Sequence, residues 1–246
     1  WFPAQLALEN VSRDPRRAGA TVGTIIVAMA IGANVAGTVG SFNRAVLDWV
    51  EQHFAADLYV GAGGRVRISG DHVLAADIAD TLRAIPGVAA VEPFRSRRIT
   101  VQGRPAFLQG IAVTERLARG WRAMVDGTLH AAASALRAGH GVLLSGGLAF
   151  FLGLHRGENV TLATPSGPRV FRVEGTYTDY LGAMDLGAVA VDYAQLGEIW
   201  GDHSVNMLRV WVAPEGSPAG VRAAILARLG AAHGYFVLTA GDFLNG

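Results

Sequence analysis

The feature that most limits how this chain can fold is a run of 26 residues without a charged side chain, Ala18–Asn43. An α-helix needs about 20 predominantly apolar residues to cross the hydrocarbon core of a bilayer. Arg16 and Arg17 precede the run and Arg44 follows it, whereas a buried helix of a soluble protein is usually shorter. The run therefore predicts a transmembrane helix over residues 18–43, and a buried soluble helix is the alternative interpretation.

The charges around this span predict its orientation. Three arginines lie just before it, whereas Asp48, Glu51 and Asp57 follow it. Positive residues stay on the cytoplasmic side, so we expect the N-terminus inside and the residues after about 44 outside. Apolar spacing before the span predicts a cytoplasmic interfacial helix over residues 1–17, and the spacing after it predicts a stalk helix over 44–56. A cleaved signal peptide has a similar order of features but a shorter apolar stretch.

Small residues recur at four-residue intervals along the predicted span, at Ala28, Gly32, Ala36 and Gly40. Such a stripe lets the backbone of a second membrane helix approach closely. The alternative is chance, because the chain contains 32 glycines and is also rich in alanine. If the stripe is functional, the helix packs against other membrane helices.

After Asp57 the pattern changes to short strands and helices, which predicts an α+β extracytoplasmic domain. Residues 57–113 and 205–246 are expected to form a mixed sheet of split βαββαβ type, with two helices on one face. Residues 114–204 would be an inserted, smaller β-rich subdomain. The predicted elements include strands at Val88–Glu92, Ile99–Val101, Phe107–Val113 and Leu208–Val212, and a helix through Leu74, Ile78, Leu82 and Ile85.

Composition excludes several chemistries. The chain has no cysteine, which rules out disulfides, iron–sulfur clusters and thiol nucleophiles, and no lysine, which rules out a Walker A phosphate loop. Its 21 arginines nearly balance 20 acidic residues, for a net charge of +1, so binding to nucleic acid is not expected.

No catalytic, cofactor or metal site is predicted. The seven histidines show no pair at helical ligand spacing. Ser145 follows a predicted strand, but Leu143 stands where a nucleophile turn requires glycine, so Ser145 is interpreted as a helix N-cap. The arginines of residues 95–104 form the densest basic patch, which is either a solvated strand face or a contact for anionic headgroups or an acidic partner.

One loop is a candidate contact surface. Residues 177–187 contain two glycines and two aspartates, yet exposing the large side chains of Tyr180, Leu181, Met184 and Leu186 to water would be costly. Exposed apolar loop residues often mark a surface for a partner protein or a hydrophobic substrate. The alternative is that the four side chains fold back onto the core of the inserted subdomain.

Several segments in order resemble the FtsX-like permeases of ABC transporters. Leu8–Arg17 resembles the entry segment of that family, and Ala56–Val60 is similar to the first strand of the MacB-like periplasmic core domain. Three later segments resemble, in order, the family's serine, leucine-glycine-leucine and strand segments: Val142–Ser145, Leu152–Glu158 and Phe171–Gly175. Gly157-Glu158 in place of the usual Gly-Asp is a mild departure.

The resemblance implies a periplasmic core of two subdomains, a Porter-like one at 57–113 and 205–246 and a Sabre-like one at 114–204. It also implies an inner-membrane protein whose outside domain is not catalytic and takes no cofactor. An ABC ATPase subunit would drive export, extraction of lipoproteins or lipids, or activation of an extracytoplasmic partner by mechanotransmission. The first residue is tryptophan, so a piece of a longer permease is expected. The alternatives are a single-helix sensor or adhesin ectodomain and, less well supported, a secreted hydrolase.

Overall fold

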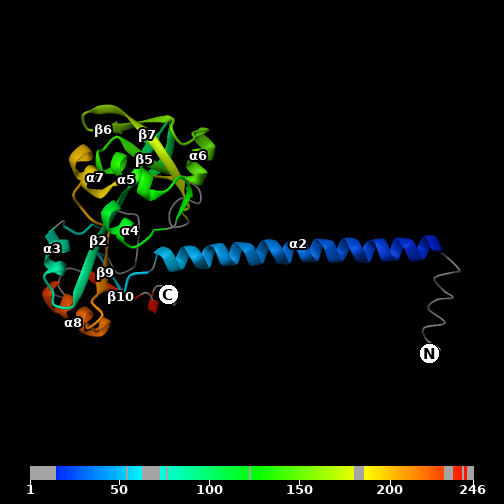
Figure 1. Cartoon of the computed structure of the whole chain (residues 1–246), viewed down its shortest axis with the longest axis horizontal. Helices are drawn as coiled ribbons and strands as arrows, with labels where there is room; N and C mark the ends of the chain where they lie inside the picture. The colour runs from blue at the N-terminus through cyan, green and yellow to red at the C-terminus, as the bar shows by residue number, and fades with distance from the viewer. Residues whose placement is uncertain are drawn as a thin grey trace. The chain divides into compact units, whose positions relative to one another are not determined.

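The computed structural model describes residues 15–53, 55–62, 73–75, 77–121, 123–179, 186–229, 235–239 and 241–242, with the backbone alone for 46–53. The chain divides into two compact units, residues 1–48 and residues 49–246. Figure 1 shows the order of the elements along the chain.

Helix α2, Pro15–His53, is 39 residues long. Proline suits its first turn, where the missing N–H would have no partner anyway. Its segment Pro15–Ala45 is long and apolar enough to cross a membrane, and its most apolar part is wholly exposed. The prediction of one long apolar helix is confirmed, and the helix continues without a break through most of the expected stalk. The predicted interfacial helix falls largely on residues 1–14, which lie outside the described residues.

The second unit is built on one mixed sheet of ten strands in the order β10-β1-β9-β2-β3-β8-β5-β7-β4, with β6 paired to β7. The strands are β1 Leu58–Ala62, β2 Val88–Val101, β3 Arg104–Ile111, β4 Met124–Asp126, β5 Gly141–Ser145, β6 Asn159–Thr164, β7 Gly167–Tyr177, β8 Ala188–Asp192, β9 Met207–Val212 and β10 Tyr235–Thr239. Pairing is parallel between β3 and β8 and between β5 and β7, and antiparallel elsewhere. The α+β prediction is thus confirmed at the level of a mixed sheet with helices.

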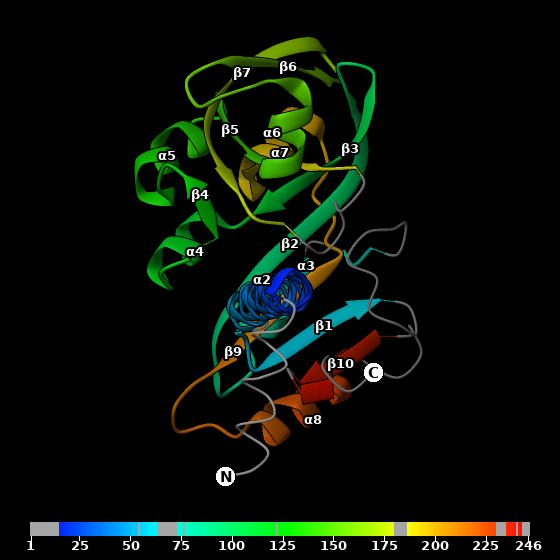
Figure 2. The same ribbon diagram turned by 90° about the vertical axis from the view of Figure 1, so that its right-hand side faces the viewer.

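Strands β10, β1, β9 and β2 form one end of the sheet, and all their pairings are antiparallel (Figure 2). Helices α3, Asp77–Arg83, and α8, Pro218–Leu229, pack on one face of these strands. Their shared core includes Leu82 of α3 and Ile225 of α8 against Leu58 and Val210 of the sheet. Because these two strand residues point to the same face, both helices cover that face.

The other end of the sheet contains β8, β5, β7, β4 and β6 (Figure 2). Four further helices belong to this part: α4 Val113–Ala118, α5 Leu129–Arg137, α6 Gly146–Leu152 and α7 Tyr193–Trp200. Helix α5 packs into one core cluster, while α6 and α7 pack into another with alternate residues of the same strands. The sheet therefore has helices on both faces in this region.

Two predicted boundaries were wrong. Val88–Glu92 and Ile99–Val101 are parts of one 14-residue strand, β2, because the arginines between them are paired with β3 and do not interrupt the strand. Leu74 is not helical but pairs with Val205 in an isolated bridge, and it is buried together with the residues of α3. Apolar spacing identified the buried positions correctly but not where the helix begins.

Candidate functional site: a buried arginine–glutamate–arginine centre

Three charged side chains meet inside the second unit. The carboxylate of Glu92, on β2, accepts hydrogen bonds through Oε1 from Nη1 of Arg209 at 2.6 Å and from Nε of Arg116 at 3.0 Å. The side chains of Glu92, Arg116 and Arg209 are 2%, 5% and 6% exposed, respectively. Buried charges on this scale are rare in proteins unless they are paired, which makes this centre the most unusual site of the described residues.

Strand register and one short helix assemble the centre. In the antiparallel pairing of β2 with β9, Glu92 lies directly opposite Arg209, so their side chains share one face of the sheet. Helix α4 follows β3 and supplies Arg116, which is buried. The centre therefore joins the β1–β9–β2 end of the sheet to the first helix after β3.

The electrostatics leave an excess of buried positive charge. Burial lowers the pKa of Arg116 to about 10, although the Glu92 carboxylate opposes this shift. Arg116 therefore stays protonated at neutral pH, and two guanidinium groups share one carboxylate. Cation–π contacts with two aromatic rings stabilise these charges. The guanidinium carbon of Arg116 lies 4.9 Å from the ring centroid of Trp121, and that of Arg209 lies 5.5 Å from the ring centroid of Phe94. Among the described residues, Nε of Arg209 has no hydrogen-bond partner.

The centre lies next to the chain segment that follows helix α2. Tyr59 is directly opposite Arg209 in the β1–β9 pairing, and its buried hydroxyl accepts a hydrogen bond from the backbone N–H of Ala56 at 3.1 Å. Burial raises the pKa of Tyr59 to about 12. Asp57 accepts a hydrogen bond from the N–H of Val212 on β9 at 2.8 Å. Residues 56–59, three to six positions after α2 ends, are thus fixed to the strand that carries Arg209.

A second set of hydrogen-bonded polar side chains extends toward the candidate loop, residues 177–187. The hydroxyl of Tyr177 donates to Oε1 of Gln109 at 2.8 Å, and Nε2 of Gln109 donates to Oδ2 of Asp179 at 2.7 Å. Burial raises the pKa of Tyr177 well above its ordinary value, with the Asp179 carboxylate adding to the shift. The rings of Tyr177 and Trp121 are 5.8 Å apart, so this set of side chains is in contact with the aromatic residue that covers Arg116.

The predicted loop residues are only partly covered by the structure. Tyr180, Leu181 and Met184 lie outside the described residues. Leu186 is half-buried and packs against the core cluster that contains Tyr177. The contact prediction therefore stays a prediction for the first three residues, and Leu186 contributes to the core.

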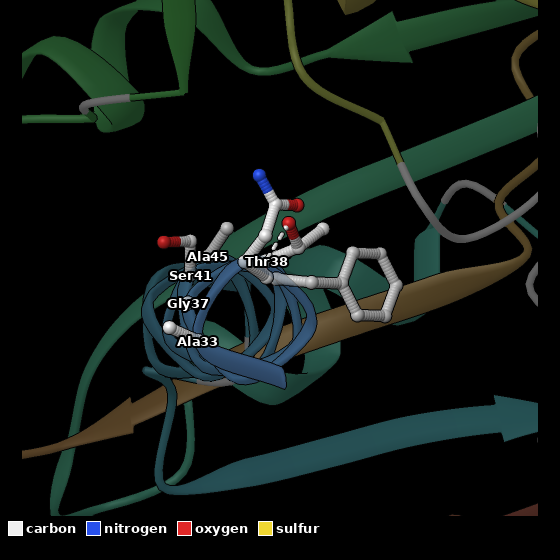
Figure 3. A pocket seen from close by; sticks show the side chains of 7 residues that line it. Ala33, Gly37, Thr38, Ser41 and Ala45 are labelled. Atoms are coloured by element: carbon white, nitrogen blue, oxygen red, sulfur yellow. Dashed lines mark hydrogen bonds between the residues drawn. The ribbon is translucent and has the colours of Figure 1, made fainter. Parts of the chain in front are cut away.

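On helix α2, the predicted stripe is accompanied by a second row of small residues. Ala28, Gly32 and Ala36 are exposed and Gly40 is half-buried, and a side-chain carbon at either glycine would meet no atom within 4 Å. A shallow groove runs along the helix (Figure 3), largely on the side away from the stripe. It is lined by Ala33, Asn34, Gly37, Thr38, Ser41, Phe42 and Ala45. The hydroxyl of Thr38 donates to the backbone oxygen of Asn34 at 2.9 Å. Small and polar residues thus share one side of the helix.

The other chemical candidates have structural roles. The side chain of Ser145 accepts from the N–H of Leu148 as the N-cap of α6, as predicted, and it also accepts from the N–H of Ala188 at 2.9 Å. The described residues contain no group of three or more potential metal ligands. In the predicted basic patch, Arg95 is bound to Asp202 at 2.9 Å and is largely buried.

The buried centre was not predicted, although the sequence contains a signal for it. In the segment Leu208–Val212, three apolar residues alternate with Arg209 and Trp211, which is typical of a half-buried strand with Arg209 on its exposed side; the Arg209 side chain is instead 6% exposed and bound to Glu92. Glu92 is the charged residue in the apolar first half of β2, Val88–Phe94, and Arg209 is the charged residue of β9, with the opposite sign. Such a complementary pair indicates a buried contact, but only the strand register shows that the two residues lie opposite each other.

The fold and these contacts define a class of protein: an α+β domain with one long apolar helix before it. A search against protein-family models matches residues 18–228 to the MacB-like periplasmic core domain. Because that match covers most of the chain, the chain belongs to this family, the extracytoplasmic domain of ABC transporter permeases of MacB/FtsX type.

Three known proteins are similar to this chain. An uncharacterized ABC transporter permease protein of Mycobacterium tuberculosis is 26% identical over 214 residues, which cover 85% of this chain and 25% of that protein. The chain thus spans about a quarter of the length of this relative. The periplasmic region of MacB from Actinobacillus actinomycetemcomitans matches with a TM-score of 0.55 at 17% identity, covering 78% of this chain and 92% of that one. The extracellular domain of the ABC-type transporter YknZ from Gram-positive bacteria matches with a TM-score of 0.49 at 14% identity, covering 75% and 99%.

Proposed function

We propose that this domain is the extracytoplasmic part of an ABC permease and that it couples ATP hydrolysis in the cytoplasm to work outside the membrane. The observation that carries the proposal is the hydrogen-bonded route from Ala56 through Tyr59 on β1, and across the strand pairing to Arg209, Glu92 and Arg116. In this proposal, movement of α2 displaces β1 and β9, and the Glu92 carboxylate transmits that displacement to α4. The domain itself carries out no catalysis and takes no cofactor.

The sheet supports the proposed two-part organisation. Strands β10-β1-β9-β2, with α3 and α8 on one face, have the order of a split βαββαβ unit. We assign residues 57–113 and 205–246 to this Porter-like part and residues 114–204 to the Sabre-like part. Strand β3 then pairs with β8 across the boundary, and Arg116 on α4 binds back across it to Glu92.

The proposed membrane contacts follow from helix α2. Its N-terminus would lie in the cytoplasm and the sheet domain outside the inner membrane, because arginines are concentrated before the span. The row Ala28, Gly32, Ala36 and Gly40 would pack against other membrane helices of the permease or against a second permease copy. An ABC ATPase subunit is the proposed cytoplasmic partner, whereas no nucleic acid is involved.

The loop after β7 is the proposed contact surface through which the movement acts on a partner or substrate. Asp179, at its base, accepts a hydrogen bond from Gln109, which accepts one from Tyr177, and the ring of Tyr177 contacts Trp121 beside Arg116 of the buried centre. We expect Tyr180, Leu181 and Met184 to contact an extracytoplasmic partner protein or a hydrophobic substrate. Changing all three to serine should abolish transport or partner binding while leaving the melting temperature nearly unchanged. A large drop in melting temperature would instead place the three side chains in the core.

The coupling proposal requires a variant that folds but cannot transmit. Replacing the whole centre by apolar residues of similar volume, as in Glu92→Leu, Arg116→Met and Arg209→Met together, removes the buried charges and is often close to neutral for stability. In the complete permease with its ATPase, we expect this triple variant to hydrolyse ATP without driving transport. Asp80→Asn is the control, because it breaks the exposed Asp80–Arg83 ion pair and leaves the hydrogen bond from Arg83 to the backbone oxygen of Val91 in place.

ATP hydrolysis and transport are measured separately, so that a loss of coupling can be distinguished from a failure to fold. Normal transport by a folded triple variant would overturn the coupling route. Failure to recover an ATPase with the permease would contradict the ABC assignment of the whole protein and favour a single-helix sensor or adhesin.

A further inference from the structure

Helix α6 exposes two adjacent aromatic side chains. Phe150 is 83% exposed and Phe151 is 59% exposed, although Leu148 and Ala149 of the same helix are buried. The two rings contact each other edge to face with centroids 5.9 Å apart. Figure 1 places α6 at the margin of the domain, beside β5 and β7. Phenylalanine is seldom exposed to this extent without a partner surface.

A positive charge accompanies the pair. Arg104, at the start of β3, lies with its guanidinium carbon 5.1 Å from the ring centroid of Phe151. The surface that we call the α6 patch, Phe150, Phe151 and Arg104, thus combines apolar rings with a cation. Aromatic rings and arginine together are typical of the interface between a bilayer and water, where the ring enters the apolar boundary and the cation meets anionic headgroups.

The size of the patch favours a lipid surface over a protein partner. The two rings expose roughly 280 Å², since a phenylalanine side chain presents about 150–250 Å² in total. A stable protein interface buries about 800 Å² on each partner, several times more. A weak lipid contact is sufficient when a second anchor already holds the protein at the membrane, because the tether raises the local concentration.

Helix α2 provides that second anchor. Its segment Pro15–Ala45 can cross a membrane, and the chain enters the sheet domain soon after the helix ends at His53. A domain of this size has a radius of gyration of about 16 Å, so its whole surface stays within a few tens of Å of the attachment point. We propose that the α6 patch docks onto the anionic lipid surface of the membrane that α2 enters, giving the domain a second, reversible membrane contact.

A fluorescence experiment on the complete chain tests this proposal. The chain has no cysteine, so Gly147→Cys on α6 gives a single labelling site, and a side chain there meets no atom within 4 Å. The labelled chain is placed in nanodiscs that carry a quencher on the lipid tails, with or without phosphatidylglycerol. Val125→Cys on β4, at a residue 67% exposed, is the matched control for an exposed apolar position away from α6.

The proposal expects strong quenching at position 147 in phosphatidylglycerol discs, at a depth of about 5–10 Å into the interface, and none at 125. Phe150→Ser with Phe151→Ser should abolish this quenching, and Arg104→Gln should reduce it to the level of neutral discs. Because the rings are exposed, the serine variant should keep the melting temperature of the parent. Equal quenching at both positions, no quenching at 147, or quenching that survives the serine changes would overturn the proposal. Shielding of position 147 only after a protein partner is added would overturn it as well.

Discussion

Replacing Glu92 by glutamine tests the buried centre most directly. Glutamine has nearly the same shape and keeps an oxygen that can accept from both arginines, so the change removes the charge while retaining an acceptor. Two guanidinium groups would then remain buried without a counter-charge. Breaking a buried ion pair by removing one partner costs about 3–5 kcal/mol. We expect Glu92→Gln to lower the free energy of unfolding by about 3 kcal/mol, the lower end of that range.

Thermal unfolding of the chain in nanodiscs, followed by near-UV circular dichroism, measures this effect. A loss of about 3 kcal/mol should lower the melting temperature by roughly 6–12 °C for a domain of this size. Asp80→Asn is the control, because Asp80 and Arg83 form an exposed ion pair that contributes little. If Glu92→Gln lowers the melting temperature no more than the control does, buried charge imbalance is not the main effect of the substitution.

A second substitution identifies the cause of the loss. In the Glu92→Gln background, Arg116→Met removes one of the two uncompensated charges, so the double variant should be more stable than the sum of the single effects predicts. Residues in one network show interaction free energies of about 0.5–3 kcal/mol. Simple additivity in this double-mutant cycle would refute the view that Arg116 and Glu92 act as one unit.

Three further predictions concern single residues near the centre and α6. Burial raises the pKa of the Tyr59 phenol to about 12, so its contribution to the free energy of unfolding is complete below about pH 10 and is lost as the pH rises to 12. Alkaline denaturation of the parent should therefore show a loss of about 2–3 kcal/mol that Tyr59→Phe lacks. Identical profiles for the two proteins would contradict this. Ser145→Ala should lower the free energy of unfolding in urea by about 2 kcal/mol, because two backbone N–H groups lose their acceptor. Esterase activity in the parent that disappears in this variant would instead support the hydrolase alternative. Gly187→Ala should cost about 2 kcal/mol or more in the same assay, because Gly187 has φ +74° and lies against Leu148; a neutral effect would show that α6 can shift.

Local patterns in the sequence predicted the features that depend on a few neighbouring residues. The N-cap at Ser145 follows from a serine before a short apolar run, and the structure confirms it. Apolar spacing identified Ile78 and Leu82 as the buried side of a helix, which is α3. Helix α5 was not predicted, although its buried residues, Leu129, Ala132, Ala133 and Leu136, recur at helical spacing.

Features that depend on strand register were not predictable in the same way. The burial of Arg209 follows from its position opposite Glu92, and the two residues are 117 positions apart in the chain. A shift of one residue would turn either side chain to the other face of the sheet. The burial of Glu92 on β2 and Arg209 on β9 can therefore be recognised only once the pairing of the two strands is known. The contact of Arg116 with Glu92 further requires the position of helix α4.

The choice of charged rather than apolar residues at the centre fits a role in transmitting movement. Apolar contacts are non-directional, so packed side chains can slide past one another at little cost. Two hydrogen bonds to the same oxygen of Glu92 restrict the position of both Arg209 on β9 and Arg116 on α4. A displacement of β9 that left α4 in place would have to break a bond to a buried charge, which is costly. In the proposed mechanism, the strand and the helix therefore move together, and an apolar centre of equal stability would lose this property.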